Sequence, residues 1–147
     1  MRATREAFGE HLPVMGEKHS NIVALDADLG KATKIASFGQ THSDRFFQMG
    51  IAEANMRSIA SGMALCGLKP VIYTITPFTT IRCLEQIRIG VAYHNAPVVI
   101  VGTGSGLSYS ELGPTHHSLE DIAILRAVPN INILTPSDKQ ELIIQLQ

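Results

Sequence analysis

A single carboxylate, Glu53, stands where a short apolar segment, residues 45–49, gives way to an apolar helical pattern. The first turn of a helix carries partial positive charge, which favours the ionised form of an acid placed there. Burial against an apolar partner surface favours the protonated form instead. A glutamate held between these two influences can share a proton with a heterocycle. The spacing alone equally fits an acid that only complements the helix dipole, because acids are common in first turns.

A pair of histidines, His116 and His117, follows the turn-forming residues Gly113 and Pro114. Loops often carry function, and histidine titrates near neutral pH and can donate a hydrogen bond to a substrate hydroxyl or carbonyl. Phe78 also follows a strand, at a Thr-Pro step before a helical pattern. Its ring can either stack on a ligand at the sheet edge or serve as an ordinary core side chain.

Acids and glycines at two other strand ends suggest further ligands. Asp26 and Asp28 close a buried strand pattern, and two acids there invite a metal hypothesis. Residues 102–106 contain the three glycines of a Gly-x-Gly-x-Gly run. The next helical pattern begins only near Ser118, so no helix N-terminus receives a phosphate, and we expect neither nicotinamide nor flavin.

The elements that must position these residues alternate along the chain. Apolar runs predict strands over residues 21–26, 45–49, 69–75, 96–102 and 130–134. Helical spacing predicts helices over about residues 2–17, 53–66 and 78–94, a short one from residue 118 and a last one from residue 137. This alternation predicts an α/β fold with a mainly parallel sheet sandwiched by helices, and with the run 96–102 near its centre.

The loops that follow the strands meet at one edge of such a sheet, where ligands bind. Glu53, Phe78, His116 and Asp28 all lie on such loops or at their ends. We therefore expect them to share one site.

Composition narrows the class of protein. The 147 residues make one domain, 45% of them are hydrophobic, and the net charge of −1 gives no reason to expect nucleic acid. No apolar run reaches the roughly 18 residues of a membrane span. Cys66 and Cys83 show neither metal-type nor disulfide-type spacing, which favours two core thiols in a reduced, cytoplasmic protein. The last helical pattern stops where the sequence stops, so we expect a single domain, residues 1–147, truncated at its C-terminus.

Several motifs together resemble the pyrimidine-binding domain of the transketolase family, over nearly the whole chain. They are Gly50-Ile51-Ala52-Glu53, Gly113-Pro114-Thr115-His116-His117, Glu85-Gln86-Ile87-Arg88, Leu119-Glu120-Asp121 and Pro129-Asn130. The chain is similar in particular to the amino-terminal part of the carboxy-terminal subunit of a split transketolase. The resemblance implies a thiamine-diphosphate-binding fold and transfer of a two-carbon ketol unit between sugars.

The resemblance also implies roles for single residues. In this family the glutamate at the place of Glu53 hydrogen-bonds the aminopyrimidine of thiamine diphosphate and activates it, and an aromatic at the place of Phe78 stacks on that ring. His116 corresponds to a histidine that contacts the sugar, and His117 either joins it or faces a partner. Asp28 matches an acid near the cofactor and the dimer contact.

A partner is implied as well. The family holds Mg2+ and the diphosphate in a second domain, whose Gly-Asp-Gly signature is absent here, so we expect no metal on this chain. A diphosphate-binding subunit or domain should complete the site in a homo- or hetero-oligomer. The helix face that carries Glu53, Met56 and Met63 is the expected contact.

Two departures concern the substrate. Gly104 and Leu112 stand where the family usually has a histidine and an aspartate that meet sugar hydroxyls. Without those partners, a deoxy, branched or nucleotide-linked sugar, or a 2-oxo acid, becomes a better donor than an ordinary sugar phosphate. The alternatives within this chemistry are a 1-deoxyxylulose-5-phosphate synthase and the beta subunit of a 2-oxoacid dehydrogenase. A non-catalytic assembly domain of the same fold is the alternative from another class.

Overall fold

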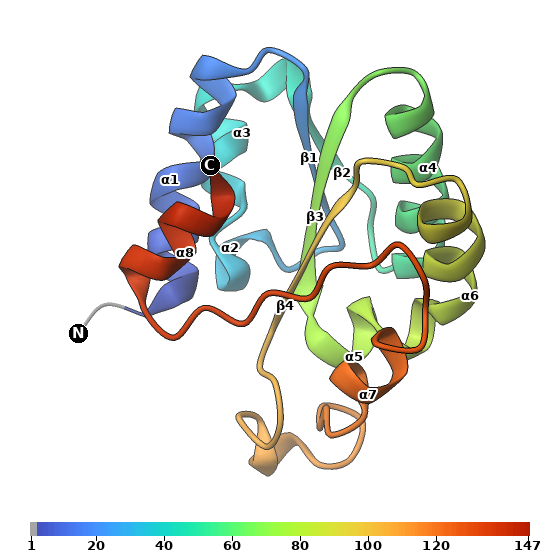
Figure 1. Cartoon of the computed structure of the whole chain (residues 1–147). Helices are drawn as coiled ribbons and strands as arrows, with labels where there is room; N and C mark the ends of the chain where they lie inside the picture. Colours follow the sequence, from blue (N-terminus) through green and yellow to red (C-terminus); the bar gives the residue numbers. More distant parts are fainter. Residues whose placement is uncertain (1–2) are drawn as a thin grey trace.

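A four-stranded sheet runs through the centre of the computed structural model, which describes residues 3–147 (Figure 1). The strands are β1 (Ile22–Asp26), β2 (Phe46–Gln48), β3 (Lys69–Ile75) and β4 (Val99–Thr103). They lie in the order β2-β1-β3-β4, and each neighbouring pair is parallel. The predicted α/β class with a parallel sheet is therefore confirmed.

Helices cover both faces of this sheet. The α-helices are α1 (Thr4–Lys18), α2 (Gly30–Thr33), α3 (Ala36–Thr41), α4 (Glu53–Leu65), α5 (Thr76–Thr79), α6 (Leu84–Gln86), α7 (Asp121–Leu125) and α8 (Lys139–Leu146). The other turns are η1 (Ser43–Arg45), η2 (Ile81–Cys83), the π-helical η3 (Ile87–Tyr93) and η4 (Ser110–Leu112). In Figure 1, α1, α2, α3 and α8 lie on one side of the sheet, and α4 and α6 lie on the other. The helix pair α5 and α7 closes the lower end, beyond the carboxyl ends of the strands.

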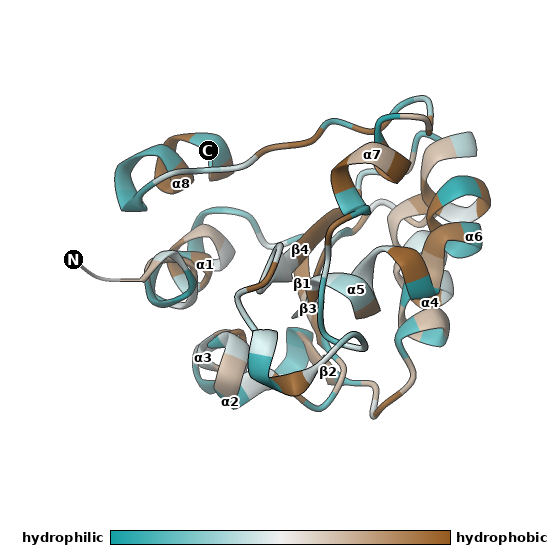
Figure 2. Cartoon of the chain, turned by 90° about the horizontal axis from the view of Figure 1, so that it is seen from below, coloured by the Kyte–Doolittle hydropathy of each residue, from teal (hydrophilic) through white to brown (hydrophobic). Residues whose placement is uncertain are grey.

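The core has two halves, one on each face of the sheet, because successive side chains of a strand point to opposite faces. Every residue of β1 is buried. One half packs α1 and α3 against the sheet through Phe8, Leu12, Met15, Ile22, Ala24, Ile35, Phe38, Val71 and Tyr73. The other packs α4 against it through Val23, Leu25, Ala27, Met56, Ala60 and Ile72. Figure 2 shows the apolar strands between helices that carry both hydrophilic and hydrophobic residues.

A proline lies inside α1 without ending it. Pro13 has no N–H, so the carbonyl of Gly9, one turn earlier, loses its usual helical donor. The hydroxyl of Ser37 in α3 donates to that carbonyl at 2.5 Å. The missing bond of α1 is thus replaced by a contact that joins α1 to α3.

The predicted helix over residues 78–94 is broken in the structure. It is divided into α5, η2, α6 and the π-helical η3. In a continuous helix the carbonyl of Thr79 would accept the N–H of Cys83, but Arg57 of α4 donates to this carbonyl instead. The N–H of Cys83 turns to the carbonyl of Thr80, 3.1 Å away. A contact from α4 thus interrupts the regular backbone hydrogen bonds of the predicted helix.

The predicted strand over residues 130–134 is wrong. Within the described part of the chain, residues 131–136 make no backbone hydrogen bonds and belong to no strand. Asn130 has a left-handed backbone (φ 62°), and its side chain donates to the carbonyl of Ala92 at the end of η3. This hydrogen bond holds the start of the segment 131–136 next to the end of η3. As a result β4 is an edge strand in this sheet, rather than a central one, and Val99 is 43% exposed.

Two predictions about exposure were also wrong. The face of α4 that was expected to meet a partner is largely buried within this chain: Met56 is completely buried, Glu53 is 5% exposed, and only Met63 is partly exposed. Both buried side chains contact the chain's own elements, Met56 in the core cluster beneath the sheet and Glu53 through Arg82. Cys83 is buried as expected, but Cys66 is exposed, because it forms the C-cap of α4 at the surface.

None of the helices within residues 3–147 is long and apolar enough to cross a membrane.

Candidate functional site

Glu53 is the first residue of α4, which follows the carboxyl end of β2 at Gln48 after a short turn. Gly50 takes a left-handed conformation (φ 69°), and the N–H of Ala52 donates to the carbonyl of Gly50 at 2.8 Å. This tight turn brings the chain from β2 into α4. The Glu53 side chain is buried, and its Oε1 accepts from Nη1 of Arg82 at 3.1 Å. A buried carboxylate at a helix start is therefore present, with one cationic partner.

A glutamine at the end of β2 fixes this turn to the neighbouring strand. The Nε2 of Gln48 donates to Oδ2 of Asp26 at 2.7 Å. Its Oε1 accepts from the N–H of Asp28 and from the N–H of Gly50, each at 3.0 Å. Gln48 thus holds together the loops that follow β1 and β2, and the second of these loops leads into Glu53.

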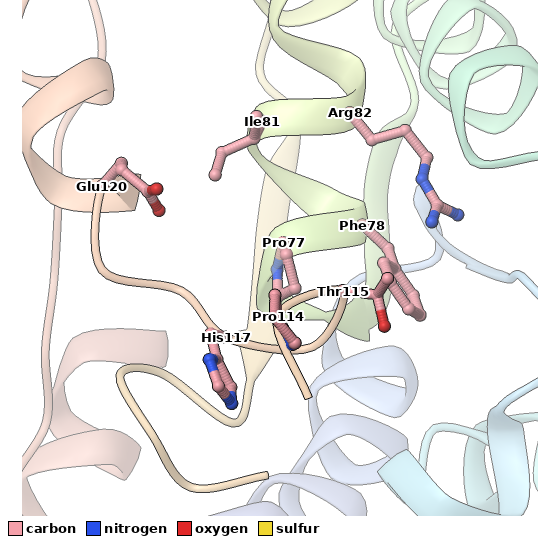
Figure 3. A pocket seen from close by; sticks show the side chains of 8 residues that line it. All are labelled: Pro77, Phe78, Ile81, Arg82, Pro114, Thr115, His117 and Glu120. Atoms are coloured by element: carbon pink, nitrogen blue, oxygen red, sulfur yellow. The ribbon is translucent and has the colours of Figure 1, made fainter. Parts of the chain in front are cut away.

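Arg82 links Glu53 to Phe78. The guanidinium carbon of Arg82 lies 4.1 Å from the centre of the Phe78 ring, and the same guanidinium contacts the Glu53 carboxylate. Figure 3 shows Phe78 and Arg82 on successive turns, with their side chains directed to the same side. A planar cation therefore lies against an aromatic ring while donating to a buried acid, an arrangement that combines cation–π attraction with a charged hydrogen bond.

Arg57 holds the backbone next to Phe78 in place. It lies one turn after Glu53 in α4, is fully buried, and donates from Nε and Nη2 to the carbonyl of Thr79 at 3.1 and 2.6 Å. Its Nη1 has no hydrogen-bond partner in the described structure. Burial lowers the pKa of Arg57 to about 10, while Cys83 and Glu53 act in the opposite direction. A costly buried charge therefore fixes the backbone next to Phe78.

The histidine loop is closed at its base by two backbone hydrogen bonds. Gly106 and Ser118 exchange N–H to carbonyl bonds of 2.9 and 3.0 Å, which pin the ends of the loop together. His116 lies edge-on to the Phe78 ring, with ring centres 5.1 Å apart, and its Nδ1 is 2.9 Å from the hydroxyl of Thr115. When that hydroxyl donates to Nδ1, the ring proton is on Nε2, which can then donate to a ligand.

A pocket of about 250 Å³ lies between α5, η2 and this loop (Figure 3). It is lined by Pro77, Phe78, Ile81, Arg82, Pro114, Thr115, His117 and Glu120. His117 contacts the carbonyl of Ser110 through Nε2 at 3.3 Å, and Glu120 reaches the pocket from the opposite side to Ile81. The pocket thus has one cation, one anion and an aromatic wall.

The side chain of Tyr109 occupies the space beside Gly104. A Cβ atom built on Gly104 would lie 2.1 Å from the Tyr109 ring, and Gly104 has a positive φ of 77°. The same ring lies edge-on to His116, with centres 6.5 Å apart. At the position of Leu112 the side chain is 51% exposed.

The structure therefore brings three of the predicted site residues together. Arg82 contacts both Glu53 and Phe78, and His116 packs edge-on against Phe78. His117 lines the adjoining pocket. Asp28 is not part of this group: its side chain is exposed, and its recorded contact is the backbone bond to Gln48.

The metal hypothesis for the β1 end gains no support. Asp26 is buried, and its carboxylate accepts from the N–H groups of Leu29 and Gly30 and from Gln48, so it fixes a turn. Across residues 3–147 there is no group of three or more His, Cys, Asp or Glu side chains arranged to hold a metal ion.

Sequence reasoning did not single out Arg82, Arg57, Gln48 or Tyr109. The first two carried a usable signal, because each lies four residues after a candidate, Phe78 or Glu53, and residues four apart share a helix face. Gln48 and Tyr109 act across the sheet edge and across a loop, and no local spacing reveals such contacts.

Comparison with known proteins agrees with this geometry. The family model for the transketolase pyrimidine-binding domain matches residues 1–147. A Methanocaldococcus jannaschii protein described as "Putative transketolase C-terminal section" is 40% identical over 137 residues, which cover 93% of this chain and 43% of that protein. A 1-deoxy-D-xylulose-5-phosphate synthase of Chlorobium phaeovibrioides is 42% identical over 138 residues, 94% of this chain and 21% of the synthase.

Among solved structures, a "Split gene transketolase, inactive beta4 tetramer" superimposes with a TM-score of 0.85 and 37% identity, over 97% of this chain and 45% of that one. The chain thus spans less than half the length of these relatives. The family model covers every residue, and a relative named as a transketolase section is 40% identical over 93% of the chain. The chain therefore belongs to the transketolase family and forms its pyrimidine-binding domain.

Proposed function

We propose that this domain is the pyrimidine-binding half of a thiamine-diphosphate-dependent enzyme that transfers a two-carbon ketol unit between sugars. The observation that carries the proposal is the position of the Arg82 guanidinium, between the Phe78 ring and the Glu53 carboxylate. A flat hydrogen-bond donor is held there by an aromatic face and a buried acid. An aminopyrimidine is also flat and also donates hydrogen bonds, so these residues fit the cofactor.

In this proposal Glu53 holds a proton at the pyrimidine ring and Phe78 fixes the ring plane. When bound, thiamine diphosphate supplies the carbon nucleophile that cleaves the bond beside a ketose carbonyl. Glu53 is suited to this role because it is at once buried and at the positive end of α4. Its position is fixed by the Gln48 network before it and by Arg57 behind it.

His116 is the residue proposed to contact the substrate, because its ring lies against Phe78, the side chain proposed to stack on the cofactor. His117 lines the pocket and is proposed as a second substrate contact. For Asp28 we propose only a place near the cofactor and the subunit contact, because its side chain points to solvent in this chain alone.

A partner must complete the site. We propose that a diphosphate-binding subunit or domain holds Mg2+ and the diphosphate, and that the active form is an oligomer. The relative whose structure is described as an inactive tetramer of beta subunits supports this need for a second component.

The donor is proposed to differ from an ordinary sugar phosphate. Tyr109 fills the space beside Gly104, and the Leu112 side chain offers no hydrogen bond. A deoxy, branched or nucleotide-linked sugar, or a 2-oxo acid, places fewer hydroxyls against this wall. The 2-oxo acid is the second candidate, because 1-deoxy-D-xylulose-5-phosphate synthases are among the relatives, at 37% to 42% identity.

The test uses the full polypeptide that contains this domain, mixed with its diphosphate-binding partner, thiamine diphosphate and Mg2+. We expect cofactor binding by calorimetry and two-carbon transfer in the mixture. Glu53→Gln should lower the transfer rate by about 10²-fold to 10⁴-fold, the usual contribution of a positioned acid or base. Glu85→Gln, at an exposed glutamate of α6, is the matched control and should leave the rate unchanged.

Three donors separate the candidate reactions: xylulose 5-phosphate, a deoxy sugar phosphate and pyruvate. Turnover of xylulose 5-phosphate alone would contradict the proposed change of donor. A mixture that binds no thiamine diphosphate would contradict the enzyme assignment and favour a non-catalytic assembly domain.

A further inference from the structure

Arg82 occupies both of the groups that the proposed function gives to the cofactor ring. Its Nη1 donates to Glu53 Oε1 at 3.1 Å, and its guanidinium carbon lies 4.1 Å from the centre of the Phe78 ring. The two contacts are made by one flat group of atoms, whose size and shape are close to those of half an aminopyrimidine.

A ring that bonded to the same oxygen of Glu53 and stacked on the same face of Phe78 would need the volume that this guanidinium fills. Two flat groups cannot lie against the same ring face and the same carboxylate oxygen, because atoms in contact already stand at van der Waals distance. The Arg82 side chain is 49% exposed, whereas that of Glu53 is 6% exposed. Arg82 can therefore leave towards water, and Glu53 cannot.

We infer that Arg82 is a placeholder for the pyrimidine ring: it neutralises Glu53 in the chain by itself and must move away when thiamine diphosphate binds. The inference rests on the proposed function. It adds that the affinity for the cofactor is set partly by this competition, so the wild-type residue weakens binding.

The size of the effect follows from the two contacts. A cation–π contact and an ion pair made by a half-exposed side chain are each weak. Removing both should therefore tighten cofactor binding by about 3-fold to 30-fold. The gain is enlarged because a buried Glu53 without its cation is an unpaired charge, which a bound hydrogen-bond donor relieves.

The experiment measures the dissociation constant of thiamine diphosphate, with Mg2+, by calorimetry on the full polypeptide together with its partner. Arg82→Met keeps the length of the side chain but removes its charge and its donors, so it should bind the cofactor more tightly than the wild type. Arg82→Lys keeps the charge but not the flat donor surface, and should lie between the two. Arg88→Met, at an exposed arginine in η3, is the matched control and should bind like the wild type.

A double-mutant cycle with Glu53→Gln adds a second readout. Without the carboxylate, Arg82 has no ion pair to lose, so Arg82→Met should give a smaller gain in the Glu53→Gln background than in the wild type. An equal gain in both backgrounds would show that Arg82 acts elsewhere.

The outcomes are distinct. If the wild type binds the cofactor and Arg82→Met binds it equally or more weakly, the proposed function stands and the placeholder role is overturned, because Arg82 then remains beside Glu53 in the complex. If neither the wild type nor Arg82→Met binds, the proposed function fails and this inference fails with it. Tighter binding by Arg82→Met, reduced in the Glu53→Gln background, supports both.

Discussion

Arg57 of α4 donates two hydrogen bonds to the backbone carbonyl of Thr79, the residue next to Phe78, from Nε at 3.1 Å and Nη2 at 2.6 Å. The helix that carries Glu53 is thereby joined to the segment that carries Phe78. Burial lowers the pKa of Arg57 to about 10, and at 1.36 kcal/mol per pKa unit this shift corresponds to a cost of about 3 kcal/mol for the charged form.

This cost predicts an unusual order for two substitutions of Arg57. Arg57→Lys keeps a buried charge but offers a single donor group to Thr79, so most of the desolvation cost remains and one bond is lost. Arg57→Met removes the charge and the unpaired Nη1. It also takes the donor away from the carbonyl and the hydroxyl of Thr79, and the unsatisfied carbonyl costs about 1–3 kcal/mol. We expect the free energy of unfolding, measured in urea, to fall more for lysine than for methionine.

The pH dependence gives the control for Arg57. Because the folded-state pKa is lowered to about 10, the unfolded chain binds this proton more tightly above about pH 10, and the stability contribution of Arg57 rises with pH in that window. The stability of Arg57→Met relative to wild type should therefore decrease there. A lysine variant as stable as the methionine variant would contradict the assigned cost of burial.

A second prediction concerns the contact between Gly104 and Tyr109. Gly104→Ala adds a Cβ atom 2.1 Å from the Tyr109 ring at a residue with φ 77°. Left-handed strain of about 1–2 kcal/mol then adds to an overpacking cost of about 1–3 kcal/mol. Gly106→Ala is the matched control, because φ is 63° there and no atom lies within 4 Å of the added Cβ.

We expect urea denaturation to show a larger loss for Gly104→Ala than for Gly106→Ala. In a Tyr109→Ala background the two losses should become similar, because only the backbone strain remains. A difference that persists without the tyrosine ring would mean that the ring does not define the space at residue 104.

The sequence predicted the sheet class and the site edge because both follow from local patterns. The strand predicted over residues 69–75 and the helix predicted to begin at Glu53 depend on neighbours in the chain, and both were found at their predicted starts. The grouping of Glu53, Phe78 and His116 followed from the rule that parallel strands end at one edge.

The parts that could not be predicted depend on contacts between distant residues. Arg57 reaches 22 residues along the chain to Thr79 and interrupts a helix whose spacing is otherwise regular. Asn130 is held by Ala92, so an apolar run typical of a strand lies outside the sheet. The position of Arg82 on Glu53 depends on the angle between α4 and the segment that follows α5, and spacing does not determine that angle.

A third prediction concerns Tyr73 in β3. Its ring packs edge-on against Phe8, with centres 5.0 Å apart, and burial raises the pKa of Tyr73 above its ordinary value of 10.0, while a hydrogen bond with Thr103 opposes the shift. A raised pKa means that the folded chain holds the proton more tightly. The stability from this group is therefore complete below pH 10.0 and is lost as the pH rises through the folded-state pKa.

Tyr73→Phe removes the titrating group and keeps the contact with Phe8. We expect the free energy of unfolding of wild type to fall more steeply than that of Tyr73→Phe when the pH is raised above 10.0, the ordinary value of the pKa. Tyr93→Phe, at a tyrosine that is 77% exposed, should retain the wild-type slope. Parallel curves for wild type and Tyr73→Phe would contradict the burial of the hydroxyl group.

The last prediction uses the two cysteines as probes of the site. Cys66 is exposed at the end of α4, whereas Cys83 is completely buried, donates from Sγ to the carbonyl of Phe78, and has a pKa that burial raises. Thiolate is the reactive form, so both burial and the raised pKa slow the reaction of Cys83. A thiol reagent should therefore modify one cysteine rapidly and the other only when the segment around Phe78 opens.

Cys66→Ser should remove the fast phase and leave the slow one unchanged. The slow phase then measures the opening of the segment that carries Phe78 and Arg82, because local opening limits the reaction of a buried group. Thiamine diphosphate, added with Mg2+ and the partner subunit, should slow it further, since a ligand that binds only the closed form suppresses opening. Equal rates for both thiols would place Cys83 at the surface, and a slow phase insensitive to the cofactor would separate this segment from the binding site.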